Sequence, residues 1–240
     1  MVFSSGARTD KGLVREENED SLYSTTTLIA VADGMGGHRA GEVASGMAID
    51  AVRSLEDVTP SERAFRTVFS EINSDVYRKG MENPELRGMG TTLTVASVEG
   101  SSVTVAHVGD SRAYLISKGE VRQLTEDHSL VQQLVSSGRI TREEASSHIS
   151  RNLITNAIGM DEDLDRVDLI RVEIGEGDFI LLCTDGLSGP LTDSQILAAV
   201  TAADVDPQWI ADHLTEEAIR RGGPDNITVV VAKLSADDGS

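Results

Sequence analysis

Short apolar runs rich in Val and Ile recur along the chain, and turn residues bound most of them. Such runs are typical of β-strands. We therefore predict strands at residues 28–32, 92–98, 103–108, 113–116, 167–174, 179–182 and 227–234. Short turns that contain glycine, at 99–101, 118–119 and 176–177, follow three of these runs. Such short connections predict antiparallel pairing of the strands on either side.

Apolar residues repeat with a helical period between the groups of strands, which predicts helices at residues 41–55, 61–79, 129–138, 193–200 and 207–221. The strands and helices are grouped and do not alternate strictly. This order favours an α+β fold with antiparallel sheets and helices on the outside. No long linker divides the chain, so we expect residues 1–240 to form a single domain. The polar stretch at about 128–156 interrupts the strand pattern and is expected to form a flap.

The charge balance excludes several classes of partner. The chain has 21 Lys and Arg against 40 Asp and Glu, a net charge of −19. This acidic excess argues against a nucleic-acid partner and against a polybasic membrane contact, because both depend on clustered cations. One cysteine, Cys183, excludes a disulfide within the chain, and no apolar run is long enough to predict a membrane segment.

Several aspartates lie where the apolar runs end. Asp33, Asp110 and Asp185 each follow such a run within three residues, and Asp225 lies in a further turn beside a proline. Converging carboxylates repel one another unless cations lie between them. Oxygen ligands without Cys or paired His favour Mg²⁺ or Mn²⁺ over structural Zn²⁺. Each aspartate alone fits ordinary turn chemistry equally well, whereas four together favour a metal site.

Six short motifs occur in a fixed order along the chain. They are R-E-E-N-E-D at 15–20, A-D-G-M-G-G-H at 32–38, G-M-G-T-T at 88–92, V-G-D-S-R at 108–112, C-T-D-G-L at 183–187 and G-P-D-N at 223–226. Together they resemble the bacterial branch of the metal-dependent (PPM, type 2C) protein serine/threonine phosphatases, over about residues 6–234. Each motif alone is weak evidence for this family, but six motifs in the same order are specific for it. The resemblance implies a central β-sandwich of two antiparallel sheets flanked by helices, which agrees with the α+β prediction.

The resemblance also implies a centre with two Mn²⁺ or Mg²⁺ ions and a third, weaker metal site. Matched motif by motif, the implied metal residues are Asp33 at both ions, Asp185 and Asp225 at the first, the Gly34 carbonyl at the second, Glu19 and Asp20 through bound waters, and Asp110 with Asp185 at the third site. Arg15 matches the arginine that binds the substrate phosphate, where a planar bidentate donor suits two oxygens. The implied reaction is direct hydrolysis of phosphoserine or phosphothreonine by a hydroxide that bridges the two metals.

Two positions depart from the family pattern. Met35 stands where the animal branch carries a histidine after the Asp-Gly pair. The match to the family therefore does not identify the residue that donates a proton to the leaving group. His38 is the nearest candidate, and a local structural role at the start of a helix fits its position equally well. Asn156 stands where the family often carries an arginine, which predicts a different substrate preference.

Other classes of protein fit the sequence less well. Ser111, with His107 nearby, suggests a serine hydrolase, but no G-x-S-x-G turn surrounds this serine. The glycines between 34 and 41 lack the Lys and Ser/Thr of a phosphate-binding P-loop. A non-catalytic relative would be expected to lack at least one of the carboxylates, and all of them are present.

The resemblance implies phosphorylated Ser/Thr proteins as partners, among them Ser/Thr kinases and their substrates. We expect a monomer without a nucleic-acid partner. We further expect a cytoplasmic location, with the alternative that the chain is the soluble catalytic domain of a membrane-anchored parent. An anionic phosphoprotein that approaches a chain of net charge −19 needs the metals and Arg15 to supply local positive charge.

Overall fold

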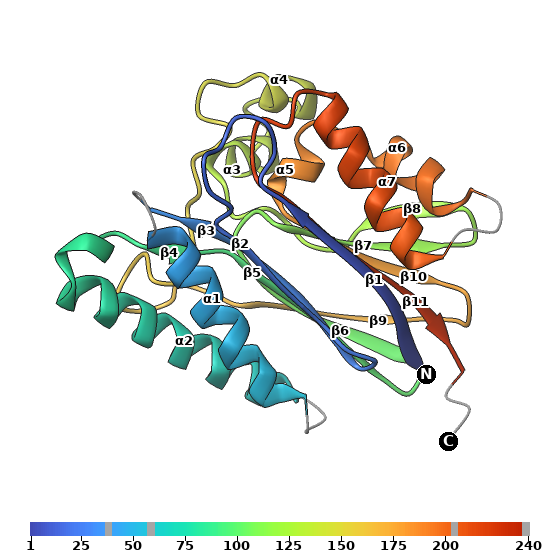
Figure 1. The fold of residues 1–240 in the computed structure, drawn as a ribbon, viewed down its shortest axis with the longest axis horizontal. Coiled ribbons are helices and arrows are strands. Elements are labelled where there is room, and N and C mark those ends of the chain that lie inside the picture. Colours follow the sequence, from blue (N-terminus) through green and yellow to red (C-terminus); the bar gives the residue numbers. More distant parts are fainter. Residues whose placement is uncertain (37–39, 57–60, 203–205, 237–240) are drawn as a thin grey trace.

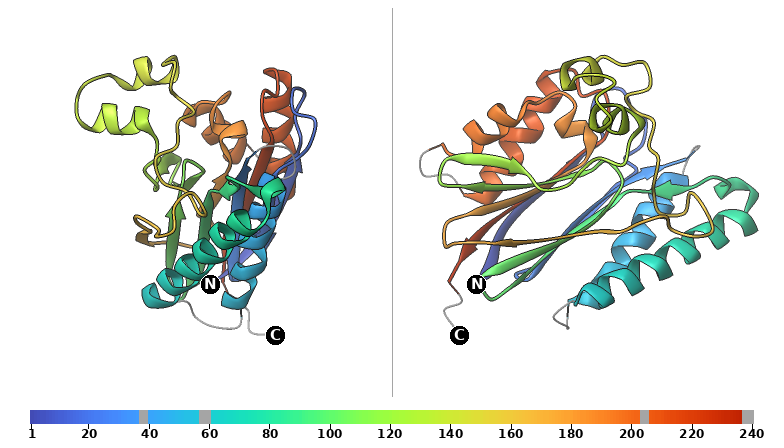
Figure 2. Two further views of the ribbon diagram at one scale, coloured as in Figure 1. Left: turned by 90° about the vertical axis from the view of Figure 1, so that its left-hand side faces the viewer. Right: turned by 180° about the vertical axis from the view of Figure 1, so that it is seen from behind.

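The chain folds into two antiparallel sheets packed face to face, with helices on both outer faces (Figures 1 and 2). The computed structural model describes residues 1–36, 40–56, 61–202 and 206–236. One sheet contains, in spatial order, β1 (Val2–Asp10), β11 (Ile227–Ser235), β10 (Phe179–Cys183), β7 (Arg112–Ser117) and β8 (Glu120–Gln123). The other contains β2 (Asp20–Ser24), β3 (Leu28–Met35), β5 (Leu93–Glu99), β6 (Ser102–Val108) and β9 (Asp168–Glu173), with β4 (Gly90–Thr91) paired to the end of β3. The predicted fold class is confirmed.

Strand β3 shows how the layers follow from the sequence. Successive side chains of a strand point to opposite faces of its sheet. Ile29 and Val31 therefore pack between the two sheets, whereas Leu28, Ala30 and Ala32 pack against the helices outside. A strand covered on both faces needs apolar side chains at every position, and this run of the sequence has them.

Helices cover both outer faces of the sandwich. On the sheet that contains β3, the helical elements are α1 (Ala40–Val52), the 3-10 turn η1 (Arg53–Leu55), α2 (Glu62–Glu82) and the 3-10 turn η2 (Pro84–Leu86). On the sheet that contains β11, they are α5 (Asp185–Ser188), α6 (Asp193–Val200) and α7 (Pro207–Arg220). Phe65 and Phe69 of α2 and Ile210 and Leu214 of α7 are fully buried beneath these layers. Figure 2 shows the four layers from the side and from behind.

Residues 128–156, the expected flap, form a projection beside one end of the sandwich (Figure 2). They contain α3 (Leu130–Ser136) and α4 (Arg142–Ser146). The two ends of the flap are joined, because the Leu130 N–H donates to the Leu153 carbonyl at 2.9 Å and the Thr155 N–H donates to the His128 carbonyl at 2.8 Å. The flap thus leaves the sandwich and returns to it at nearly the same point.

The predicted elements differ from the structure in a few places. Strands β1, β2, β4 and β8 and helices α4 and α5 were not predicted. The pairing expected across the turn at 176–177 is wrong, because this turn carries the chain from β9 in one sheet to β10 in the other. There, the Gly177 N–H donates to the Leu234 carbonyl at 2.9 Å, so the turn is fixed to β11. Asp33 lies inside β3, which continues to Met35.

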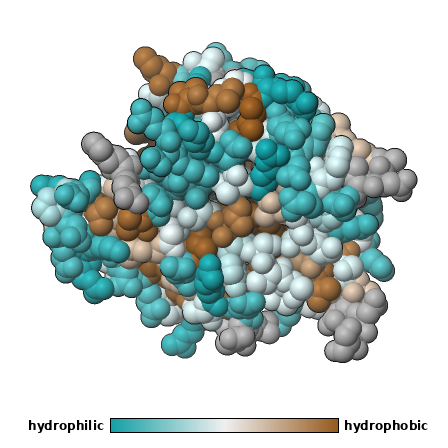
Figure 3. Space-filling model, in the orientation of Figure 1, coloured by the Kyte–Doolittle hydropathy of each residue, from teal (hydrophilic) through white to brown (hydrophobic). Residues whose placement is uncertain are grey.

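Hydrophilic side chains cover much of the face shown in Figure 3, as expected for a chain of net charge −19. Apolar side chains also gather at the end of the molecule that carries the flap and the loop between β1 and β2. Among the helices of the described ranges, none combines the length and the apolar character that a bilayer crossing requires.

Candidate active site

The chain turns that carry the candidate residues meet at one end of the sandwich. Neighbouring antiparallel strands alternate in direction, so the ends of β3, β6 and β10 lie beside the starts of β2 and β11. There they form a cavity of about 180 Å³. Seven of the residues expected at the site line it: Arg15, Glu19, Asp33, Gly34, Asp110, Asp185 and Asp225. Met35, Gly36, Asn152, Ile154 and Asn226 complete the lining. His38 lies outside the described residues.

Asp33 is positioned through its backbone by two threonines. Its N–H donates to Thr92 Oγ1, and its carbonyl accepts from Thr91 Oγ1 and from the Thr92 N–H, each at 2.9 Å. Thr92 Oγ1 also bonds to Ser111 Oγ at 2.8 Å. These backbone contacts fix the position from which the Asp33 carboxylate reaches the cavity. Both threonines belong to one of the six motifs, but the motif alone does not indicate this role.

Asp20 is buried beside the cavity and is the cross-strand partner of Asp33. Thr184 Oγ1 donates to Asp20 Oδ2 at 2.9 Å, whereas Asp20 Oδ1 has no partner in the described parts of the chain. Glu19 Oε1 is likewise buried and unpartnered there. Buried carboxylate oxygens without a partner are costly, so these two atoms indicate where waters or cations belong.

Two glycines allow the backbone segments of the site to touch. A Cβ atom on Gly34 would lie 2.2 Å from the Gly41 carbonyl oxygen and 2.4 Å from that of Glu19. On Gly186 it would lie 1.9 Å from the carbonyl oxygen of Asn226. No side chain fits at either position. Each Asp-Gly pair therefore places a carboxylate beside a close backbone contact. This contact requires glycine at the second position for a reason beyond ordinary turn chemistry.

Asn226 fastens the β1–β2 loop, which carries Arg15, to the start of β11. Its Nδ2 donates to the carbonyls of Lys11 and Glu17 at 3.0 and 2.9 Å, and its Oδ1 accepts from the Glu19 N–H at 2.9 Å. One amide side chain thus holds three points of the loop. Asn226 lies in the last of the six motifs, but the motif alone does not indicate that it positions the loop.

Burial and the charges of neighbouring carboxylates raise the pKa values of four site residues, Asp20, Asp33, Asp110 and Asp185. Burial, helped by the charge of Asp185, raises the pKa of Asp110 to about 8. Burial likewise raises the pKa of Asp20 to about 7. Burial and the charge of Asp225 raise the pKa of Asp185 to about 6. The pKa of Asp33 lies well above its ordinary value because the residue is buried among the other carboxylates. The cavity therefore favours added positive charge.

The donor set fits hard divalent cations, because carboxylate and carbonyl oxygens are the ligands that Mg²⁺ and Mn²⁺ prefer. As the side chains of the described residues stand, no group of three or more His, Cys, Asp or Glu is arranged to hold an ion. Arg15 Nη2 instead donates to Asp225 Oδ2 at 2.7 Å and occupies this oxygen. This hydrogen bond also raises the pKa of Arg15. Ligation by Asp225 through Oδ2 therefore requires Arg15 to move away.

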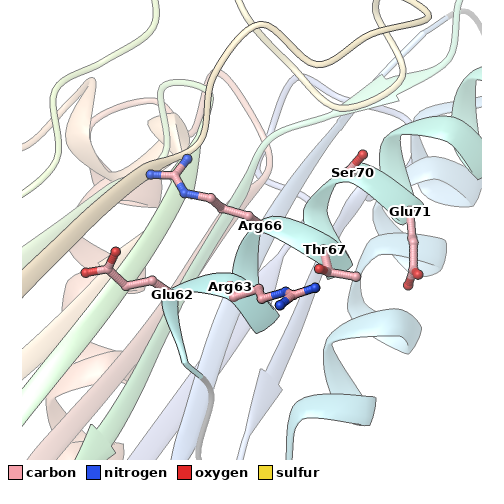
Figure 4. A pocket seen from close by; sticks show the side chains of 6 residues that line it. All are labelled: Glu62, Arg63, Arg66, Thr67, Ser70 and Glu71. Atoms are coloured by element: carbon pink, nitrogen blue, oxygen red, sulfur yellow. The ribbon is translucent and has the colours of Figure 1, made fainter.

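A larger hollow, of about 710 Å³, runs along α2 and does not involve the carboxylates. Its lining residues all belong to this one helix: Glu62, Arg63, Arg66, Thr67, Ser70 and Glu71. Figure 4 shows that their side chains spread along the helix and do not converge on one point. It is not a candidate for catalysis.

The structure also tests the serine hydrolase alternative. Ser111 is fully buried and its Oγ bonds to Thr92, while His107 Nδ1 bonds to Thr94 Oγ1 at 2.9 Å. Burial lowers the pKa of His107 to about 3. The two residues thus have separate partners, and neither lines the cavity. They do not form a nucleophile and base pair.

Comparison with known proteins agrees with this geometry. The family model for protein phosphatase 2C matches residues 11–217. The serine/threonine protein phosphatase PstP of Mycobacterium tuberculosis is 46% identical over 237 residues, which cover 98% of this chain and 45% of PstP. The chain thus spans about half the length of this relative. The serine/threonine phosphatase stp of Listeria monocytogenes is 37% identical, with 94% of each protein covered.

Solved structures show the same fold. A crystal structure of M. tuberculosis PstP/Ppp has a TM-score of 0.92 at 45% identity and covers 98% of this chain and 100% of the solved one. The catalytic domain of PstP in complex with two manganese ions has a TM-score of 0.89 at 43% identity, with 98% and 99% covered. With the matched family model and these relatives, the chain belongs to the protein phosphatase 2C family.

Proposed function

We propose that this chain is a metal-dependent protein serine/threonine phosphatase, which hydrolyses phosphoserine and phosphothreonine in proteins. The convergence of Asp33, Asp185 and Asp225 with Arg15 in one cavity carries this proposal. Converging carboxylates repel one another and so create a place for cations, and a guanidinium at the same opening supplies a phosphate-binding group. The names of the bacterial relatives support the same activity.

Asp33, Asp185, Asp225 and the Gly34 carbonyl are the residues that would hold two Mn²⁺ or Mg²⁺ ions. Asp110 with Asp185 would hold a third, weaker ion, and Glu19 and Asp20 would accept hydrogen bonds from coordinated waters. When bound, the ions supply Lewis-acid charge and an activated water for attack on phosphorus. Manganese is supported by the homologous PstP catalytic domain, whose structure contains two manganese ions.

Arg15 would bind the phosphate of the substrate and orient it for in-line attack. Its side chain is half exposed at the opening of the cavity, and its only partner among the described residues is Asp225. A planar guanidinium can donate two parallel hydrogen bonds to phosphate oxygens, so the phosphate can replace this carboxylate as its partner. His38 stays our candidate for the proton donor to the departing serine or threonine oxygen.

We further propose phosphorylated Ser/Thr proteins as the partners, including Ser/Thr kinases and the substrates of these kinases. The chain would act as a monomer, in the cytoplasm or as the catalytic domain of a membrane-anchored parent. Phosphoproteomic comparison of cells with and without the protein tests the kinase partners. Unchanged phosphorylation of the kinases would contradict this part of the proposal.

The decisive experiment is turnover of a phosphothreonine peptide titrated with Mn²⁺, with a chelator control. We expect activity only with the metal. Asp33→Ala should lower kcat by about a thousandfold or more, because this carboxylate would hold both ions. The matched control is Asp163→Ala, in an exposed acidic loop outside the cavity, which should keep normal activity. Near-normal, metal-dependent turnover by Asp33→Ala would contradict the assignment, and turnover that survives chelation would favour a metal-free mechanism.

A further inference from the structure

Two large apolar side chains are exposed on the loop that carries Arg15. Leu13 and Val14 are 68% and 67% exposed and directly precede this residue. The loop is held in place, because the Leu13 N–H donates to the Gly223 carbonyl at 2.9 Å and Asn226 bonds to the loop backbone on either side of these residues. The apolar side chains are therefore presented to solvent from an ordered backbone.

The flap presents a second pair of exposed apolar side chains. Ile149 is 98% exposed and Leu153 is 52% exposed. Leu153 lies between Asn152 and Ile154, both of which line the cavity. Its carbonyl accepts from the Leu130 N–H, so its backbone is also fixed. Four of the seven large apolar side chains that are exposed in the described residues thus belong to the two segments that border the cavity.

These four residues, Leu13, Val14, Ile149 and Leu153, are called the apolar rim below. In Figure 1 the flap and the β1–β2 loop lie at the same end of the molecule, and the left view of Figure 2 shows them on different sides of α5. Figure 3 shows apolar side chains gathered at this end. Apolar side chains that gather on a soluble surface beside a polar cleft mark a binding surface, because their exposure to water has no benefit for folding.

The occupant of the apolar rim follows from what enters the cavity, and this step rests on the proposed function. A phosphate that reaches the carboxylates is attached to a serine or threonine within a polypeptide, so the neighbouring residues must cross the rim. We propose that the apolar rim binds apolar side chains that flank the phosphorylated residue. The protein would therefore prefer phosphorylated segments with residues such as Leu, Val or Ile next to the phosphate. The net charge of −19 separately disfavours acidic flanking residues, which would be repelled.

The test compares two phosphothreonine peptides of equal length and charge, one with Leu and Val beside the phosphothreonine and one with Ser and Gly there. We expect the wild-type protein to have a KM about fivefold to tenfold lower for the apolar peptide, the effect of burying one or two side chains. Equal KM values for the two peptides would overturn the proposal. p-Nitrophenyl phosphate, which has no flanking residues, reports whether the catalytic site itself works. If the wild-type protein had no activity toward any of the three substrates, this would instead contradict the proposed function.

Variants test whether the apolar rim causes the preference for the apolar peptide. The double variants Leu13→Ser/Val14→Ser and Ile149→Ser/Leu153→Ser should raise the KM for the apolar peptide toward that of the polar peptide. Turnover of p-nitrophenyl phosphate should stay unchanged, since these side chains are absent from the cavity lining. The matched control is Met81→Ser, at the end of α2, which removes an equally exposed apolar side chain (62%) away from the cavity. Preference for the apolar peptide that persists in both double variants would overturn the assignment to the rim.

Discussion

At the scale of single residues, the site depends on groups that fix the backbone as much as on the carboxylates. Thr91 and Thr92 hold Asp33 through its N–H and carbonyl, and Asn226 holds three points of the loop before β2. The motifs contained these residues, but a one-dimensional pattern does not show which backbone atom a side chain will reach. Asp33, Asp110 and Asp185 were predictable because they follow apolar runs, whereas Glu19 and Asp20 were indicated only by the resemblance.

Gly186 provides a sharp test of the close contact between two chain turns. Gly186→Ala would place a Cβ atom 1.9 Å from the Asn226 carbonyl oxygen, so the turn with Asp185 must shift away from Asp225. We expect loss of about 2 kcal/mol or more of unfolding free energy and a large loss of Mn²⁺-dependent activity. Gly46→Ala is the matched control, because a Cβ atom there meets nothing within 4 Å and the residue lies inside α1. It should stabilise the protein by about 0.5–1 kcal/mol in urea unfolding and leave activity intact.

Arg15 is expected to affect metal binding and substrate binding in opposite directions. Arg15→Ala frees Asp225 Oδ2, which now accepts a hydrogen bond of 2.7 Å, and removes a positive charge beside the metal residues. Half-maximal activation should therefore need less Mn²⁺, while kcat/KM for a phosphopeptide falls by about tenfold to a hundredfold. Titrations of activity against Mn²⁺ and against peptide separate the two effects. Arg8→Ala, at a surface ion pair with Asp212, should change neither. A higher Mn²⁺ requirement in Arg15→Ala would show that the Arg15–Asp225 pair does not compete with metal.

At the scale of elements, strands with continuous apolar runs were predictable and half-polar strands were not. Strand β1 has only Phe3 and Gly6 buried among its nine residues, and β8 has none. Both lie at an edge of their sheet, where one side lacks a strand neighbour and polar side chains are tolerated. The turn at 176–177 has the composition of a hairpin, but the partners of β9 and β10 are set by packing in different sheets. Local sequence does not contain this information.

Helix α2 is connected to the site through one buried side chain. Asn73 Oδ1 accepts from the Gly159 N–H at 2.8 Å, and its Nδ2 donates to the carbonyls of Asp161 and Glu162 at 3.1 and 3.0 Å. The neighbouring Ile158 pairs with Thr91, which bonds to Asp33.

Asn73→Ala should therefore cost about 2–4 kcal/mol of unfolding free energy, since it leaves the buried Gly159 N–H and two partly buried carbonyls without their partner. Urea unfolding measures this loss. The matched control is Asn83→Ala, at the exposed C-terminal cap of α2, where one hydrogen bond to Lys79 is removed and less than about 1 kcal/mol should be lost. Equal effects of the two substitutions would show that the loop after Ile158 does not depend on Asn73.

At the scale of the whole molecule, the sandwich brings carboxylates from five separate segments to one end, although the chain already carries a net charge of −19. Few of the charges form this site; most lie on the surface. The sequence predicts both the overall excess and the acidic positions. It does not show how strongly burial changes their proton affinity, because this depends on neighbours distant in the chain, such as Asp110 and Asp185.

The stability of the chelated protein should therefore fall as pH rises from about 5 to about 8. The pKa values of Asp185, Asp20 and Asp110 are raised to about 6, about 7 and about 8, whereas in the unfolded chain they return to the ordinary value of about 4. At pH values between the ordinary pKa of about 4 and the raised pKa values, the folded protein binds more protons than the unfolded chain. The unfolding free energy therefore decreases as pH rises. Mn²⁺ should reverse the trend, because it binds the ionised carboxylates and offsets their repulsion.

Thermal unfolding at about pH 5, 6.5 and 8, with chelator and with Mn²⁺, measures both effects. In chelator, Tm should fall by several degrees across this range, and the gain from Mn²⁺ should be largest at about pH 8. Asp110→Asn removes the carboxylate whose pKa is raised to about 8, so this variant should show a flatter decline in chelator over the whole range from about pH 5 to 8. Asp163→Asn, in the exposed acidic loop, is the matched control and should follow the wild type. A Tm of the chelated wild type that is constant or rises with pH would mean that these carboxylates are not held in mutual repulsion, and the main physical reason for cations in the cavity would be lost.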